Sequence, residues 1–459
     1  MSKSGLAVGD EIVIEVERAA GDGVCVARHE GQVVFVRDVL PVEQAQVRVT
    51  SIGRKGRFVR ADLIKVLRES EHRVTPPCNL ARECGGCDWQ HAELSYQREL
   101  KRDILFENLR KFGGFQDLEQ IEPTQQRVID HLVVEPLDDN AGLGYRTRMR
   151  FAIDDAGYVG LRAARSHKII PAVDCLLPVP EISEVVPDQV TNFGDERSLV
   201  AATSISLELA EDSANELHPT ALDAAGSNAM QASSVSQSSA KLHAEFGGRD
   251  THRPVTAQVR DRTFEVDLNG FWQVHRSAPE TLVDAVLKFA QVQLGETIFD
   301  LYSGVGLFSA FLAEATGLTG AVHAIEGDED AIEYARQNLD DLSWVTTTCA
   351  DVTDLVHFAE HPQHFVHPAA PDSVRAQETK PHADLIVADP PRAGLGEEVV
   401  KSIVSLNPQR VVYVSCDSAT FARDVKTFAE HGYHLDQLRA FDLFPMTKHL
   451  ETVALLIPA

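Results

Sequence analysis

Residues 297–308 read TIFDLYSGVGLF, and this stretch decides the fold of the carboxyl-terminal half of the chain. An apolar run leads into two closely spaced glycines, Gly304 and Gly306, and the apolar segment LFSAFLAEAT follows. Glycine lets the backbone turn tightly and approach a ligand closely. The stretch therefore predicts a strand, a tight turn and a helix whose first turn faces a small molecule.

The same alternation continues to the end of the chain. AVHAIE, DLIVADPP and RVVYVSCD have the apolar character of buried strands, and DEDAIEYARQNL has the spacing of a helix. Strands that alternate with helices predict an α/β domain whose parallel sheet is wrapped by helices. Its ligand is expected at the carboxyl ends of the strands.

Acidic residues at two strand ends suggest the kind of ligand. Glu326 ends the second predicted strand, where a carboxylate can accept hydrogen bonds from both ribose hydroxyls. Asp351 ends the third, a place suited to an adenine edge. A dinucleotide would want a third glycine for its pyrophosphate, and Ala310 lies too far along to replace it. S-adenosylmethionine, which has no phosphates, fits better.

The fourth predicted strand ends in Asp389-Pro390-Pro391-Arg392. An acidic residue before two prolines makes a rigid, extended loop beside the reactive methyl group, as in methyltransferases that act on planar bases. Enzymes that methylate the adenine amino group place an aromatic residue after the prolines, whereas this chain has Arg392. The motif therefore points away from adenine.

Cys416 follows the apolar strand RVVYVS at the edge where the ligand is expected. A lone cysteine is commonly a buried structural residue. Carbon 5 of uracil, however, is a poor nucleophile, and a thiolate that adds at carbon 6 would activate it. A base must then remove the carbon-5 proton. Glu451, at the start of the last strand, is the candidate base, with a surface glutamate as the alternative.

Four motifs, DLYSGVGLF, ADPPRAG, SCDSATFARD and FPMTKHLETV, together resemble the RNA 5-methyluridine methyltransferase family. The resemblance implies a Rossmann-like class I S-adenosylmethionine methyltransferase in which Cys416 is the nucleophile and Glu451 the base. Beside the turn glycine Gly304, it implies a set of cofactor-binding residues: Gln273, Tyr302, Glu326, Asp351 and Asp389.

The sequence departs from the family pattern at three positions. Ser303 stands where the family often has Cys, Ser418 where Pro is usual, and His275 where Asn would follow the F-x-Q motif. None of these changes removes a chemical role. The His275 change leaves the exact placement of Gln273 open.

With 459 residues, 44% of them hydrophobic, the chain is expected to form about three domains. Residues 8–66 alternate polar and apolar in short runs, which predicts a small antiparallel β-barrel of about five strands. It resembles the OB-like, RNA-binding TRAM domain. We assign residues 1–67 to this barrel, 68–255 to a β-rich central domain and 256–459 to the methyltransferase domain.

Three further segments complete the organisation. Residues 93–112 have helical spacing, and by resemblance this helix crosses over to pack on the catalytic domain. Residues 211–250 are rich in Ser, Ala, Asn and Asp, which predicts a flexible insertion, because such a composition buries little apolar area. A second insertion, rich in His and Pro, spans about 360–382.

Cys78, Cys84 and Cys87 are spaced C-x5-C-x2-C around two glycines, and Cys175 is the candidate for a distant fourth ligand. Zinc and cubane clusters both use four ligands. The larger members of the resembled family carry a [4Fe–4S] cluster on this pattern, so iron–sulfur is preferred to zinc. Radical S-adenosylmethionine enzymes use C-x3-C-x2-C instead. A structural cluster, which shapes an RNA-binding surface, is therefore expected.

The formal net charge of −26 argues against a wholly basic surface, but basic residues crowd two stretches, 48–73 and 146–168. Phosphate contacts are local, so these stretches are compatible with RNA. The expected substrate is 23S ribosomal RNA, with transfer RNA as the alternative. A catalytically silent RNA-binding assembly factor is a competing hypothesis. Without an apolar run of 18 residues or a leader pattern, a cytoplasmic monomer with no membrane partner is expected.

Overall fold

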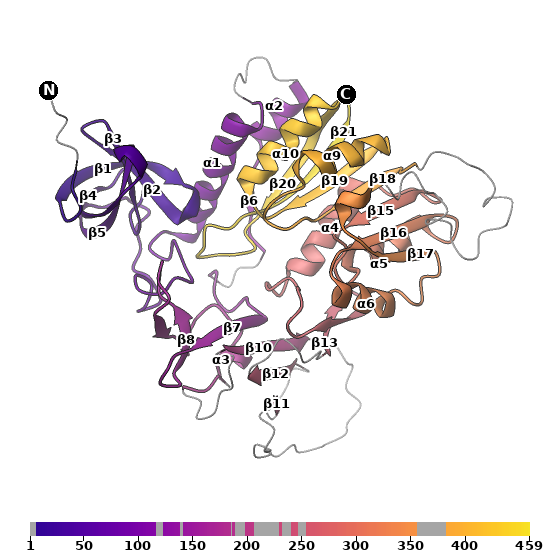
Figure 1. Cartoon of the computed structure of the whole chain (residues 1–459), viewed down its shortest axis with the longest axis horizontal. Helices are drawn as coiled ribbons and strands as arrows, with labels where there is room; N and C mark the ends of the chain where they lie inside the picture. Colours follow the sequence, from indigo (N-terminus) through magenta and orange to yellow (C-terminus); the bar gives the residue numbers. More distant parts are fainter. Residues whose placement is uncertain are drawn as a thin grey trace.

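The computed structural model describes residues 6–115, 123–137, 141–184, 186–188, 198–205, 229–231, 240–246, 254–355 and 382–459 (Figure 1). The chain forms three main parts: an amino-terminal barrel, a central sheet and a large carboxyl-terminal sheet. Within the described ranges, no helix combines the length and the apolar character needed to cross a membrane.

The amino-terminal strands form a closed barrel in the order β1-β2-β3-β5-β4. The predicted five-stranded barrel is therefore confirmed, but it is not wholly antiparallel, because β3 and β5 pair in parallel. The polar–apolar alternation determines which residues face the core, whereas strand direction depends on how the barrel closes. The strands are β1 (Glu11–Ala20), β2 (Val24–His29), β3 (Gln32–Val36), β4 (Gln44–Ile52) and β5 (Phe58–Arg68).

Helix α1 (Leu94–Phe112) connects the barrel to the large carboxyl-terminal sheet, which is called the catalytic sheet below. Leu100 and Ile104 belong to the barrel core, whereas Leu105 and Leu109 belong to the core on one face of the carboxyl-terminal sheet. At its end, Asn108 Nδ2 donates a hydrogen bond of 2.8 Å to Ser418 Oγ. The predicted crossover of this helix is confirmed.

The central sheet has the order β11-β12-β10-β7-β8-β9. Two of its strands, at residues 229–231 and 240–246, lie inside the segment 211–250, whose flexibility stays a prediction. AKLHAEF alternates apolar and polar residues, a strand pattern that the overall composition obscured. The remaining residues of that segment, and 360–381 of the second insertion, lie outside the described residues. The strands are β7 (Arg148–Ile153), β8 (Val159–Arg162), β9 (Ile169–Pro171), β10 (Ser198–Ile205), β11 (Ala229–Gln231) and β12 (Ala240–Phe246).

The large sheet has the order β17-β16-β15-β18-β19-β21-β20-β6. The predicted parallel sheet is confirmed for the first five strands, and β21 and β20 extend it antiparallel. Its strands are β15 (Thr297–Leu301), β16 (Ala321–Glu326), β17 (Val345–Cys349), β18 (Leu385–Ala388), β19 (Arg410–Ser415), β20 (Tyr433–Phe441), β21 (Glu451–Pro458) and β6 (Val134–Glu135).

Helices cover both faces of this sheet (Figure 1). One core contains residues of α4, α5 and α6, and the other contains residues of α1, α2, α9 and α10. Strand β6 and helix α1 fall within the predicted central domain 68–255. In the structure, however, β6 pairs with β20 of the catalytic sheet, and α1 packs against a face of that sheet. The helices are α2 (Pro123–Asp130), α4 (Ala278–Ala290), α5 (Leu307–Thr316), α6 (Glu329–Asn338), α9 (Gly396–Ser405) and α10 (Ser418–Glu430), beside the hairpin β13 (Pro254–Val259) and β14 (Arg262–Asp267).

Candidate active site

The carboxyl ends of neighbouring parallel strands bring most of the predicted site residues to one edge of the sheet. Tyr302 follows β15, Glu326 ends β16, Asp389 follows β18 and Cys416 follows β19. In the β15–β18 pairing Leu301 lies opposite Ala388, so Tyr302 and Asp389 leave the sheet side by side. This is the place where open α/β sheets bind ligands.

The glycine turn after β15 has the geometry of a ligand-binding turn. Gly304 and Gly306 have φ of 54° and 90°, in the left-handed region that favours glycine. A Cβ on Gly306 would lie 2.8 Å from Leu339 Cδ1, whereas one on Gly304 would meet no atom within 4 Å. Gly306 therefore permits close helix packing, and Gly304 keeps open space in front of the turn.

Glu326 is held by backbone donors at this turn. Its Oε2 accepts a hydrogen bond of 2.9 Å from Gly304 N, and its Oε1 accepts one of 2.9 Å from Asp328 N. A carboxylate has about four acceptor positions, so both oxygens can accept further hydrogen bonds. The residue is thus fixed in orientation and still able to bind hydroxyl groups.

Tyr302 and Asp351 lie close enough to interact electrostatically. Burial, and then the negative charges of Asp351, Asp424 and Glu326, raise the pKa of Tyr302 to about 12. Asp351 is exposed, and its Oδ1 accepts a hydrogen bond of 2.9 Å from Thr353 N, which lowers its pKa. The structure therefore brings together the predicted residues from three strand ends.

Cys416 directly follows β19, and Glu451 is the first residue of β21, the strand paired with β19. Ser415 lies opposite Thr452 in the antiparallel β19–β21 pair, so the next residue on one strand faces the preceding residue on the other. Burial, and then the carboxylates of Glu451 and Asp389, raise the pKa of Cys416 to about 12, whereas the Arg392 guanidinium opposes this rise. The thiol and the carboxyl therefore share one electrostatic environment.

The carboxyl groups of this site are strongly perturbed. Glu451 is only 2% exposed, and burial, followed by the nearby Asp389 charge, raises its pKa well above the ordinary value. Burial and then the charge of Asp300 raise the pKa of Asp389 to about 7. Such shifts are typical of carboxyl groups that exchange protons during catalysis, although structural networks also produce them.

The structure adds residues to the site to which the sequence assigned no role. Arg392 Nη2 lies 3.3 Å from His449 Nε2. Burial, and then the Arg392 charge, lower the pKa of His449 to about 4, so its imidazole is neutral. Asp424 fixes the backbone after Arg392, since its carboxylate accepts hydrogen bonds from Leu395 N and Gly396 N at 2.8 and 3.1 Å. Both Arg392 and His449 lie in the sequence motifs, but the motifs do not show that the two side chains are in contact. The contact depends on how two distant loops pack in the fold.

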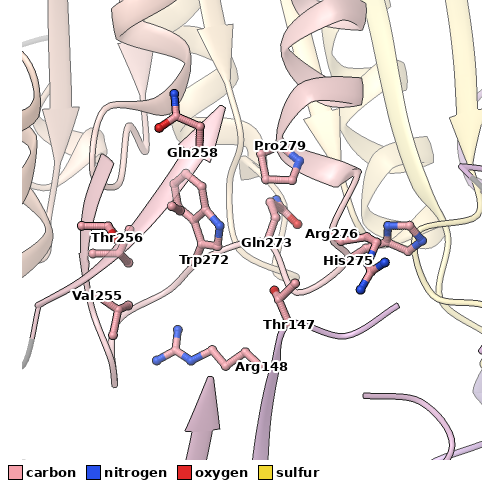
Figure 2. Close-up of a pocket in the computed structure, with 12 residues that line it drawn as sticks. Thr147, Arg148, Val255, Thr256, Gln258, Trp272, Gln273, His275, Arg276 and Pro279 are labelled. Atoms are coloured by element: carbon pink, nitrogen blue, oxygen red, sulfur yellow. The ribbon is translucent and has the colours of Figure 1, made fainter. Parts of the chain in front are cut away.

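Gln273 lines an open pocket of about 540 Å³ between the β13–β14 hairpin and the start of α4 (Figure 2). None of the other predicted cofactor residues lines this pocket, so the role of Gln273 stays a prediction. His275, which replaces the expected Asn, stacks on Tyr145 with ring centroids 5.0 Å apart. Its Nδ1 accepts a hydrogen bond of 3.1 Å from Ser277 N. Figure 2 shows Gln273 beside Trp272 and Pro279.

The four cysteines predicted to bind a cluster come from two parts of the central region. Cys87 and Cys175 pack in one small core, and all four are free thiols. Burial, with smaller contributions from Cys175 and Cys84, raises the pKa of Cys87 to about 12. The pKa of Cys175 is raised by burial, and also by Cys84 and Cys78. The four thiols are therefore close enough to influence one another.

Polar hydrogens point at these sulfur atoms. Gln90 Nε2 donates to Cys87 Sγ at 3.0 Å, and Gly86 N donates to Cys84 Sγ at 3.4 Å. As the side chains lie, however, no three His, Cys, Asp or Glu groups in the described ranges are close enough to hold a metal ion. The donor set suits a thiolate-ligated group in its chemistry, whereas binding would require the thiols to draw closer.

The glycine turn, the acidic strand ends and the sheet define a methyltransferase that uses S-adenosylmethionine. A sequence profile described as tRNA (Uracil-5-)-methyltransferase matches residues 239–458. An RNA methyltransferase of Streptomyces avermitilis, itself uncharacterized, is 36% identical over 98% of this chain and 99% of its own length. A Streptomyces coelicolor relative of the same description is also 36% identical, over 98% of this chain and 94% of its own. The chain belongs to the tRNA (uracil-5)-methyltransferase family of RNA methyltransferases.

A solved structure shares the fold. The tRNA (uracil-54, C5)-methyltransferase of Pyrococcus abyssi, in complex with S-adenosyl-L-homocysteine, superposes with a TM-score of 0.63. The two sequences are 24% identical, and the match covers 97% of this chain and 99% of the other. The likeness therefore extends over all three parts of the molecule.

Proposed function

We propose that this enzyme methylates carbon 5 of a uridine in RNA through a covalent adduct between Cys416 and carbon 6 of the base. The observation that carries the proposal is the placement of Cys416, directly after β19, beside Glu451, the first residue of β21, next to the Ser415–Thr452 pair. Their electrostatic coupling, with Asp389 beside both, supports the same assignment. A nucleophile and a base within one cluster are what this chemistry needs.

The reaction would follow an order that these residues impose. The Cys416 thiol loses its proton to solvent, which its partial exposure allows, and Arg392 favours the resulting thiolate. The sulfur adds to carbon 6, and the electrons of the 5,6 double bond become an enolate. Carbon 5 then takes the methyl group of S-adenosylmethionine and releases S-adenosylhomocysteine. Glu451, in its ionised form, removes the carbon-5 proton, the double bond re-forms and the carbon–sulfur bond breaks.

The cofactor would lie against the strand ends already described. Gly304 leaves room in front of the turn, and Glu326 presents a fixed carboxylate suited to ribose hydroxyls. In this proposal Asp351 would serve the adenine edge, while Tyr302, Asp389 and Gln273 would complete the site. These residue roles rest on the family resemblance together with the convergence of Tyr302, Glu326, Asp351 and Asp389.

The preferred substrate is 23S ribosomal RNA, because a TRAM-like barrel together with a cysteine cluster resembles the ribosomal branch of the family. Transfer RNA is the second candidate, since the Pyrococcus abyssi relative is named for transfer RNA. The base would be flipped out of its helix to reach the thiol. A cytoplasmic monomer is part of this proposal. The juxtaposed Cys416 and Glu451 argue against a catalytically silent assembly factor.

We also include a [4Fe–4S] cluster held by Cys78, Cys84, Cys87 and Cys175 in the proposal. The mutual influence of these thiols and the N–H donors at two of the sulfur atoms support it. When bound, such a group would supply a structural cross-link rather than a reacting centre. No step of methyl transfer depends on it.

The test separates the two chemical roles. Unmodified 23S and transfer RNA are incubated with the enzyme and S-adenosylmethionine, and 5-methyluridine is mapped by mass spectrometry. Glu451→Gln keeps size and hydrogen bonding but loses the base, so we expect one methylation followed by a protein–RNA adduct that survives denaturing gels. A general base typically contributes about 10²–10⁴-fold, which sets the expected loss of turnover. Normal turnover by Glu451→Gln would show that another residue is the base.

A further inference from the structure

The loop of residues 442–450 leads directly into Glu451, and elements outside the catalytic sheet hold it in place. It connects β20 to β21 and contains His449. Beyond it, strand pairing fixes the chain, because Thr452 lies opposite Ser415. The approach of Glu451 to the site therefore depends on how the 442–450 loop is held on its other side.

Asp88 and Trp89, which follow Cys87, form hydrogen bonds to this loop at two points. Asp88 N and Trp89 N both donate to Met446 O, at 2.9 and 3.0 Å. Asp88 Oδ2 then accepts a hydrogen bond of 3.1 Å from Lys448 N, the residue before His449. Asp88 thus binds the loop on both sides of Thr447, through its backbone on one side and its side chain on the other. These contacts fix the backbone that leads to Glu451.

Helix α1 holds the earlier part of the same loop. Gln97 is fully buried, and its Oε1 accepts a hydrogen bond of 2.9 Å from Met446 N. Lys101 Nζ donates to Asp442 Oδ1 at 2.5 Å and to Phe444 O at 3.0 Å. Met446 has φ of 67°, an unfavourable backbone conformation for a residue other than glycine. Such a conformation persists where surrounding contacts determine it, as they do here.

The barrel makes room for the Asp88 carboxylate. A Cβ on Gly23 would lie 2.4 Å from Asp88 Oδ1, so only glycine fits at this turn. The barrel also contacts the loop through Asp22, whose Oδ1 accepts a hydrogen bond of 3.0 Å from Lys448 Nζ. Asp22 and Asp88 therefore bind the same lysine, one at its exposed side-chain end and the other at its backbone.

We propose that Asp88 is a positioning residue that sets the placement of Glu451 by fixing the backbone of Lys448. The inference rests on the proposed role of Glu451 as base. Proton removal depends on the distance and direction of the base, so a small displacement of the loop slows that step. Addition of Cys416 and methyl transfer use groups directly after β19 and at the cofactor turn, with which Asp88 forms no hydrogen bond among the described residues.

The experiment compares three variants with the wild type. Asp88→Ala removes the acceptor, Asp88→Asn keeps an oxygen there, and Asp22→Ala removes the exposed ion pair on the same lysine as a matched control. Methyl transfer in a single turnover and decay of the protein–RNA adduct are timed separately. S-adenosylhomocysteine affinity, melting temperature and iron content are measured on the same preparations.

We expect Asp88→Ala to slow adduct decay by about 10-fold or more, since misplacement by about 1 Å can cost 10²-fold. Its methyl-transfer rate and S-adenosylhomocysteine affinity should stay near those of the wild type. Asp88→Asn should recover most of the lost rate, and Asp22→Ala should behave as wild type. This split between two steps would not follow from a general loss of stability.

Two results would overturn the inference: adduct decay by Asp88→Ala at the wild-type rate, or a parallel loss of both steps with melting temperature. If Asp88→Ala does not fold, Gln97→Leu, which removes the acceptor of Met446 N, replaces it with the same expected split. Glu451→Gln is run beside them. If that variant turns over normally, the proposed base is wrong, whereas stalling of Glu451→Gln with normal decay in Asp88→Ala rejects only the positioning role.

Discussion

The cysteine at the sheet edge and the cysteines of the central region have similar pKa shifts but different neighbours. Burial raises the pKa of both Cys416 and Cys87 to about 12. Around Cys416 the other charged groups include the carboxyls of Glu451 and Asp389 and the Arg392 guanidinium. Around Cys87 they are the thiols of Cys84 and Cys175 and the Arg146 guanidinium. Each of the two thiols therefore has a cation near it, but Cys416 lies beside carboxyl groups, whereas Cys87 lies beside other thiols.

This difference shows that the role of a cysteine is better inferred from the groups around it than from its own pKa. A thiol beside a carboxyl and a guanidinium can form a thiolate, attack and later be released, because a base and a cation are at hand. A group of thiols presents several soft donors to one centre and no base. We therefore expect the two sites to respond independently to substitution.

The largest effect is expected at the sheet edge. Cys416→Ala should abolish formation of 5-methyluridine and of any covalent RNA adduct, because no enolate can be made without the thiolate. RNA and cofactor binding should persist, and iron content should match that of the wild type. Methyl transfer and denaturing gels check the first two points. 5-Methyluridine formed by Cys416→Ala would show that another group carries the chemistry.

The reciprocal substitution tests the other half of the comparison. After anaerobic purification we expect about four irons and four sulfides per chain, and Cys84→Ser should lose most of them. Cys349→Ser is the matched control, since Cys349 is exposed at the end of β17 and lies outside the proposed ligand set. Iron and sulfide assays decide the matter. Stoichiometric zinc without iron would replace the cluster with a zinc site.

A smaller effect should appear in the pH profile. Arg392 lowers the pKa of both Cys416 and Glu451. Arg392→Met removes that cation, so both pKa values should rise, and less thiolate should be present at neutral pH. The pH at which adduct formation reaches half its maximum should move upward by about one unit or more, a usual size for loss of a nearby opposite charge. An unchanged profile would show that Arg392 does not act on the thiol.

The smallest effect is expected on the surface of the barrel. Arg54 and Arg57 are exposed on the β4–β5 connection, so Arg54→Ala with Arg57→Ala should weaken RNA binding. The slope of its salt dependence should fall by about one for each phosphate group that the variant no longer binds. Arg48→Ala is the control, because Arg48 pairs with Glu11 at 2.7 Å. Equal salt slopes in the double variant and the wild type would exclude this surface from RNA binding.

The sequence predicts local features well. The TIFDLYSGVGLF stretch becomes strand, glycine turn and helix, and the acidic residues at the strand ends meet because parallel strands share one carboxyl edge. The parallel pairing of β3 with β5 and the pairing of the strand at 240–246 were not predicted, since alternation does not encode pairing partners. Similarly, the contact between Arg392 and His449 depends on two loops that the motifs do not relate.

The Asp88 contacts escaped prediction for the same physical reason. Asp88 lies next to a predicted ligand, Cys87, and nothing in its local sequence indicates a partner 360 residues later, at Lys448. The two segments meet because the barrel, α1 and the catalytic sheet share cores through Ile104 and Leu105. Tertiary packing of this kind is visible only in the folded molecule.

The buried ion pair of Lys101 and Asp442 also has a consequence for folding during translation. Lys101 is fully buried on α1, and its partner follows 341 residues later. At about 5–20 residues per second, a translating ribosome delivers Asp442 roughly 17–70 s after Lys101. The core that Leu105 and Leu109 join is completed over the same interval, because it contains residues of β15, β18, β19 and α10. Lys101 gains its buried partner only afterwards, so the protection of α1 from proteolysis should become complete only when the 442–450 loop has emerged.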